Sequence, residues 1–149
     1  MASIPTPAAG AAQALDRALA VLLLRLALGL DILIHGVNRL FISGLGAFVN
    51  STAAQFQHSV LPIWQVRAVA TAIPFLEFTI GLLLVSGVAL RWTLIGGAVL
   101  MLALEFGTAM RSDWTVVSSQ WLYSLLYSAL LFCRAWDAYS LDALRRKTR

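Results

Sequence analysis

Four long apolar blocks dominate this sequence and restrict what the chain can fold into. They run over residues 18–41, 69–90, 92–110 and 116–132, with short polar stretches between them. A helix rises 1.5 Å per residue, so about 17–24 residues are enough to cross a hydrocarbon core of about 30 Å. The apolar residues form continuous runs rather than amphipathic patterns, which is typical of membrane spans. The sequence therefore predicts an all-α fold, a bundle of four transmembrane helices.

The charge content favours the same class of protein. Of the 149 residues, 60% are hydrophobic and only 12% are charged, whereas a soluble domain carries about 25% charged residues. The basic residues give a pI near 10.0, but they crowd at span ends and at the C-terminus, where they act as topology signals. We therefore expect the lipid bilayer as a partner and no nucleic acid.

The segments outside the blocks predict the organisation of the chain. Residues 1–14 are rich in Ala, Pro and Gly, so they should form a flexible N-terminal tail before a single membrane domain over residues 15–149. Aromatic and apolar residues in the first loop suggest a short interfacial helix, ended by Pro62. Residues 134–149 should form a basic C-terminal tail.

Basic residues also predict the orientation. Four spans place both termini on one side, and this side would hold Arg17, Arg91, Arg134, Arg145, Arg146, Lys147 and Arg149. The other side would hold only Arg39, Arg67 and Arg111. The positive-inside rule then predicts cytoplasmic termini, an outward-facing first loop and a multi-pass protein of the inner (cytoplasmic) membrane.

Residues that usually hold redox centres are scarce. Cys133 is the single cysteine, so the chain cannot supply the roughly four Cys ligands of an iron–sulfur cluster. Of the two histidines, only His35 lies in a predicted span, which disfavours a haem held by two histidines across the membrane. From this chain alone we expect no haem, iron–sulfur cluster or metal, and quinone is the cofactor to consider.

Polar side chains nevertheless occur inside the predicted spans, where each is costly. Asp31, His35 and Asn38 fall within about 60° of each other on a helix. Glu77 and Glu105 lie in the outer halves of the second and third spans, and the fourth span adds a polar face. Because lipid exposure is unfavourable for such groups, we expect these polar side chains to face the interior of the bundle and to form one layer there. Its members, with their neighbours, are Arg25, Asp31, His35, Asn38, Arg39, Glu77, Glu105, Gln120, Tyr123 and Tyr127.

This layer has two interpretations. One is a satisfied polar network that holds the bundle together, with Asp31 or Glu77 paired with Arg25 or Arg39 and the Arg25–Glu77 pair as the first candidate. The other is an outward-opening pocket. There, His35, Asp31 and Glu77 would exchange protons as catalytic groups, and the remaining polar residues would bind a quinone through its carbonyl oxygens.

Several short motifs follow one another along the chain. They are RLALG at residues 25–29, HGVNRL at 35–40, PFLE at 74–77, GLLL at 81–84, FGTAMRSDW at 106–114 and YSLD at 139–142. In this order, over about residues 20–145, they resemble the DoxX/DoxD family of four-helix membrane proteins. The segment at 106–114, with Gln120 and Tyr123, looks like the DoxD side of that family. This side includes the large subunit of a thiosulfate:quinone oxidoreductase.

The resemblance implies a membrane subunit of an oxidoreductase that interacts with quinone and with a sulfur compound or a redox partner. The alternative is a non-catalytic subunit that anchors or stabilises a larger membrane complex. A third interpretation, a path for a small solute or protons, is less favoured because four short helices leave little room for a transporter. In the first two cases, the expected partners are other subunits or further copies of the chain.

Overall fold

A computed structural model describes residues 7–148, which are helical apart from turns and contain no strand. Four helical segments in this part of the chain are long and apolar enough to cross a membrane. They are Gly10–Ile42, Ile63–Ser86, Leu90–Ala109 and Trp114–Lys147. The prediction of an all-α, four-helix membrane bundle is confirmed, and the chain is a multi-pass membrane protein.

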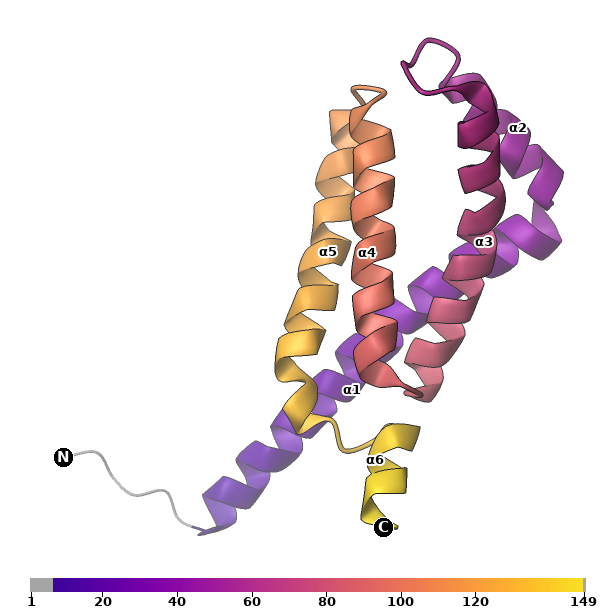
Figure 1. Cartoon of the computed structure of the whole chain (residues 1–149). Helices are drawn as coiled ribbons and strands as arrows, with labels where there is room; N and C mark the ends of the chain where they lie inside the picture. The colour runs from indigo at the N-terminus through magenta and orange to yellow at the C-terminus, as the bar shows by residue number, and fades with distance from the viewer. Residues whose placement is uncertain (1–6, 149) are drawn as a thin grey trace.

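The four long helices associate as two pairs (Figure 1). Helix α1 (Pro7–Val37) packs against α3 (Ile63–Ser86), and α4 (Leu90–Ala109) runs beside α5 (Trp114–Cys133). The pairs come together near the α3–α4 turn, and their ribbons lie farther apart toward the opposite end.

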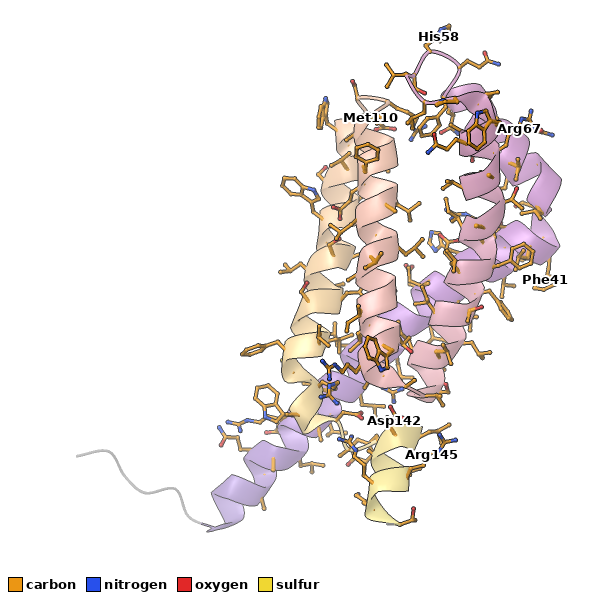
Figure 2. All side chains as sticks on the ribbon, in the orientation of Figure 1. Phe41, His58, Arg67, Met110, Asp142 and Arg145 are labelled. Atoms are coloured by element: carbon orange, nitrogen blue, oxygen red, sulfur yellow. The ribbon has the colours of Figure 1, made fainter. Side chains whose placement is uncertain are left out.

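Different segments of the chain lie at the two ends of the bundle. One end, here called the terminal end, holds the start of α1, the α3–α4 turn and α6 (Leu141–Lys147). The other, the loop end, holds the α2–α3 loop and the α4–α5 turn. Figure 2 shows Asp142 and Arg145 at the terminal end, and His58 and Met110 at the loop end.

The helix predicted in the first loop is present, but its placement differs from the prediction. A π-helical turn, Asn38–Ile42, follows α1, and Gly44 then adopts a φ of 85°, which favours glycine. Helix α2 (Leu45–Gln55) runs beside α3 and buries Ala53, so it is part of the bundle wall. It ends well before Pro62, which instead precedes the first turn of α3, where its fixed φ suits a helix start.

Parts of both predicted tails are helical. Helix α1 begins at Pro7, so residues 7–14 are helical, and the rest of the predicted N-terminal tail lies outside the described residues. The predicted C-terminal tail contains a 3₁₀ turn, Arg134–Trp136, and helix α6, which begins after Ser140. The Ser140 hydroxyl accepts a hydrogen bond from the Ala143 amide at 3.0 Å, so α6 has a side-chain N-cap.

The hydrophobic core lies where the two helix pairs meet. Leu28 of α1, Leu84 of α3, Leu94 of α4 and Tyr127 of α5 are all buried there. The Tyr127 ring occupies the space that a side chain at Gly97 would need, so this glycine lets α4 approach α5 closely. Most other large apolar side chains are exposed, as expected for helices that face lipid.

Two glycines set the distance between α1 and α3. A Cβ atom on Gly36 would lie 2.7 Å from the Cα of Phe78, and one on Gly81 would lie 2.6 Å from the Cα of Leu33. These contacts are with backbone, which cannot move aside as the end of a side chain can. The two helices therefore pack in this register only with glycine at both positions.

We expect Gly36→Leu to lower the free energy of unfolding by about 1–3 kcal/mol, because the new side chain overpacks the α1–α3 contact. The measurement is the thermal unfolding midpoint of the purified protein in detergent. Gly96→Leu is the matched control, because Gly96 is also in a spanning helix but has nothing within 4 Å of its added Cβ. Equal midpoints for the two variants would contradict the prediction.

Candidate functional site

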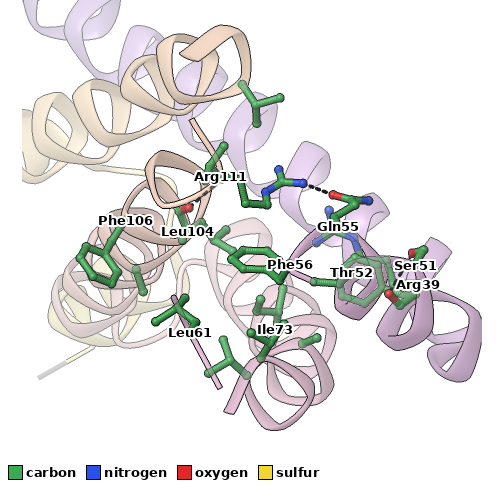
Figure 3. Close-up of a pocket in the computed structure, with 18 of the residues that line it drawn as sticks. Arg39, Ser51, Thr52, Gln55, Phe56, Leu61, Ile73, Leu104, Phe106 and Arg111 are labelled. Atoms are coloured by element: carbon green, nitrogen blue, oxygen red, sulfur yellow. Dashed lines mark hydrogen bonds between the residues drawn. The ribbon is translucent and has the colours of Figure 1, made fainter. Parts of the chain in front are cut away.

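A cavity of about 810 Å³ lies between the two helix pairs, toward the loop end (Figure 3). Apolar residues make up just over half of its lining. Most of them, among them Phe48, Ile73 and Leu104, come from α2, α3 and α4. Asn38 and Gln120 are among the polar residues of the lining. Volume and composition are those of a site for a small organic molecule, since such sites span about 300–1,000 Å³.

Arg111 joins the two helix pairs at the loop end of this cavity. Its guanidinium, in the α4–α5 turn, donates a hydrogen bond to Gln55 at the end of α2 (Figure 3). The same guanidinium lies 5.1 Å from the centre of the Phe56 ring and 3.6 Å from Asp113 Oδ2. These contacts hold the wall formed by α2 against the α4–α5 pair.

Arg39 links the cavity to a buried carboxylate. It lines the cavity, and its guanidinium donates a hydrogen bond to Glu77 Oε1 on α3. The Glu77 side chain is only 3% exposed and that of Arg39 is 26% exposed. The guanidinium also lies 4.5 Å from the centre of the Phe48 ring. Arg39 therefore stands between the cavity and Glu77, which does not itself line the cavity.

A group of polar side chains from α1, α3 and α5 adjoins this ion pair. His35 Nδ1 lies 2.9 Å from the Asp31 carbonyl oxygen and 3.8 Å from Asp31 Oδ2. Asp31 and His35 are close enough for their charges to act on Glu77. On α5, Tyr123 and Tyr127 lie within electrostatic range of Asp31. Three helices thus bring together five side chains that the sequence placed in one layer.

Several polar atoms in and beside this group are buried without a hydrogen-bond partner within the described residues. They are Asp31 Oδ2, Glu77 Oε2, Gln120 Oε1 and the Tyr127 hydroxyl oxygen. A buried polar atom left unpaired costs about 1–3 kcal/mol, so such atoms are uncommon in a folded protein. Their concentration near the cavity marks this part of the bundle as the candidate site.

The comparisons with known proteins agree with the helical architecture. A family model described as DoxX matches residues 20–109, more than half of the 149-residue chain. The chain belongs to the DoxX family. Neither a curated protein nor a solved structure matches it. The matched part of this DoxX protein contains Asp31, His35, Arg39 and Glu77, whereas α5 lies beyond it.

The expected pairing of Arg25 with Glu77 is wrong. The Arg25 guanidinium donates to the carbonyl oxygens of Leu84 at 2.5 Å, Val85 at 2.9 Å and Tyr139 at 3.3 Å, at the terminal end. Arg39, which pairs with Glu77 instead, lies 14 positions later in the chain, about 21 Å along a helix. Arg25 is therefore too far from Glu77 to pair with it. Carbonyl oxygens at the end of a helix have few backbone partners and carry partial negative charge, so those of Leu84 and Val85 are good acceptors for a cation.

The cavity also differs from the one expected. Glu77 is linked to it through Arg39, but Asp31, His35, Glu77 and Tyr123 are not among its lining residues. Glu105 does not line it either, and accepts a hydrogen bond from Ser124 across the α4–α5 contact.

Sequence reasoning missed one wall of the DoxX cavity altogether. Helix α2 and the residue after it contribute Phe48, Ser51, Thr52, Gln55 and Phe56, which were assigned to a surface helix. Phe48 and Phe56 are eight residues apart, the spacing of one helix face, and this is the signal that could have pointed inward. An interfacial helix shows the same spacing, so the sequence alone could not separate the two placements.

Proposed function

We propose that this DoxX protein is the membrane subunit of an oxidoreductase and binds a quinone headgroup in the cavity. The observation that carries the proposal is the apolar cavity of about 810 Å³ with Asn38, Arg39 and Gln120 in its lining. A quinone has a flat apolar ring, a lipophilic tail and two carbonyl oxygens that accept hydrogen bonds. The two amides and the guanidinium supply donors for those oxygens, and the apolar lining suits the ring.

The buried group suits the protons of this reaction. Reduction of a quinone to a quinol takes up two electrons and two protons. Arg39 connects the cavity to Glu77, and His35 and Asp31 adjoin that carboxylate. Histidine and carboxylate side chains hold and pass on protons near neutral pH. In this proposal the loop end faces outward from the inner membrane, and the termini lie in the cytoplasm.

The electrons come from a sulfur compound such as thiosulfate, or from a redox partner, bound by another subunit. This assignment follows the DoxD-like motif at residues 106–114, which lies at the loop end beside the cavity. The donor is oxidised by two electrons, and the quinone receives them. This chain binds the acceptor and supplies the proton-carrying side chains.

A second candidate, an anchoring subunit of a membrane complex, is favoured by a separate observation. The side chains of Asp31 and His35 are 41% and 48% exposed, although both belong to the span of α1. Ionisable groups in a span seldom face lipid, because the exposure is costly. A partner subunit or a second copy of the chain that covers this side would remove that cost, whether or not the cavity binds quinone.

The two candidates are separated by filling the cavity. Ala103→Phe, in α4, places a ring in the lining, whereas Leu102→Phe changes the neighbouring exposed position, which does not line the cavity. We expect Ala103→Phe to weaken binding of a short-chain ubiquinone analogue by at least about tenfold, equal to a loss of about 1.4 kcal/mol. The measurement is equilibrium binding to the purified protein in detergent.

Leu102→Phe should bind the analogue as wild type does, because its ring faces the detergent or lipid. If Ala103→Phe folds with a normal unfolding midpoint and also binds as wild type does, the cavity is not a quinone site. The anchoring function would then be the better account of this protein.

A further inference from the structure

A second, smaller pocket of about 250 Å³ lies at the terminal end, away from the cavity of the proposed function. It is formed by the start of α4, the α5–α6 connection and α6. Its lining residues are Leu90, Arg134, Asp137, Asp142, Arg145 and Arg146. Asp142 and Arg145 are labelled at this end in Figure 2. Three arginines in so small a pocket indicate a ligand with negative charge.

The two aspartates of this pocket are already engaged. The Asp142 carboxylate accepts hydrogen bonds from the amides of Ala89 at 3.1 Å and Leu90 at 2.8 Å, and so caps the start of α4. Asp137 Oδ2 accepts a hydrogen bond from the Ser140 hydroxyl and lies 3.8 Å from Arg146 Nη2. Asp142 and the Oδ2 atom of Asp137 therefore serve the fold of the chain itself, whereas Asp137 Oδ1 is buried with no hydrogen-bond partner among the described residues.

Two arginines of the pocket remain for a ligand. Within residues 10–148, neither Arg134 nor Arg145 forms a side-chain hydrogen bond or an ion pair, whereas Arg146 approaches Asp137. A guanidinium offers several donors in a planar fork that matches a phosphate group. The positive charge and the donor geometry of these two guanidinium groups suit a phosphate group.

The surroundings of the pocket indicate that the phosphate belongs to a lipid. Exposed apolar residues lie one or two positions before its lining residues in the chain, namely Phe132, Trp136, Leu141 and Leu144. Arg17 lies 5.1 Å from the centre of the Trp136 ring, and tryptophan with arginine at the end of a span is typical of the membrane interface. A phospholipid provides a phosphate for the arginines and acyl chains for the apolar side chains. A free phosphate ion would satisfy only the first.

We propose that this pocket binds the phosphate headgroup of an anionic phospholipid. Basic pockets at the membrane interface on the cytoplasmic side are suited to such headgroups. Bound there, the lipid would contact the α5–α6 connection, α6 and the start of α4 together, and would hold the C-terminal segment against the bundle. The site is independent of the quinone cavity, and its test does not require enzyme activity.

The test compares lipid binding by two double variants of the full chain. Arg134→Gln with Arg145→Gln removes the two arginines that have no acidic partner. Arg91→Gln with Lys147→Gln removes the same charge from the same end of the bundle, but neither residue lines the pocket. The measurement is the apparent Kd for phosphatidylglycerol and for phosphatidylcholine, obtained by native mass spectrometry of the purified protein in detergent.

We expect wild type and the Arg91/Lys147 variant to prefer phosphatidylglycerol. The Arg134/Arg145 variant should bind it about 30-fold more weakly, which corresponds to about 2 kcal/mol for two arginines. Equal losses in both variants would mean a general surface attraction and would overturn the proposal. Inorganic phosphate that displaces phosphatidylglycerol at equal concentration would overturn the lipid assignment.

A folding defect is recognised from the unfolding midpoint measured with phosphatidylcholine alone, which should be the same in wild type and variant. If the Arg134/Arg145 variant fails this check, Arg145→Gln alone replaces it, because that side chain is exposed on α6. Its expected loss of phosphatidylglycerol affinity is about fivefold. An unchanged Kd in this folded variant would overturn the proposal.

Discussion

Arg39→Met is expected to lower the free energy of unfolding by about 3–5 kcal/mol, because it leaves Glu77 buried without its partner. The Glu77 side chain is only 3% exposed, so water cannot replace the lost guanidinium. The substitution keeps most of the apolar length of Arg39, and with it part of the packing against Phe48. Most of the expected loss in the free energy of unfolding therefore comes from the unpaired Glu77 carboxylate.

A double-mutant cycle identifies the pair. Glu77→Gln removes the buried charge, so Arg39→Met with Glu77→Gln should be more stable than Arg39→Met alone. Unfolding midpoints in detergent give the comparison. Arg67→Met is the control, because Arg67 is exposed and only donates a 3.0 Å hydrogen bond to Asn50. If the effects of the Arg39 and Glu77 substitutions simply add, the pair does not contribute to stability as proposed.

The spans could be predicted because lipid solvation demands long apolar runs, and such runs are visible in sequence. The ends of the helices were harder to predict, because they depend on individual contacts, some of them with residues far away in the sequence. Helix α3 starts after Pro62, six residues before its apolar block. The start of α4 is capped by Asp142, which is 52 residues away from Leu90 in the chain. No local sequence pattern predicts a helix cap from a residue so far away in the chain.

The candidate site could be predicted in part, for a similar reason. Helical periodicity places Asp31, His35 and Asn38 near one another on the first span, whatever the fold. Partners on other helices depend on where the axes cross. The close contact of α1 with α3 at Gly36 brings the end of α1 to Glu77, so the nearest arginine is Arg39. A sequence that offers two arginines and two carboxylates does not specify this choice.

Arg25 is the other residue at which we expect a large effect. Its side chain is among the largest that are fully buried, with only 2% of the residue exposed. It donates to the carbonyl oxygens of Leu84, Val85 and Tyr139. One side chain therefore joins α1, the end of α3 and the segment before α6.

Arg25→Met should lower the free energy of unfolding by roughly 3 kcal/mol or more, because hydrogen bonds to a charged group contribute about 1.5–3 kcal/mol each. It should also release the segment around Tyr139, seen as faster amide hydrogen exchange in α6. Arg25→Lys should recover only part of both effects, since an ammonium group lacks the planar fork that reaches several carbonyls. The control is Arg67→Met, an exposed position on α3 at the loop end, far from α6. If Arg25→Met leaves the exchange of α6 as slow as in the control, then Arg25 does not hold the C-terminal segment on the bundle.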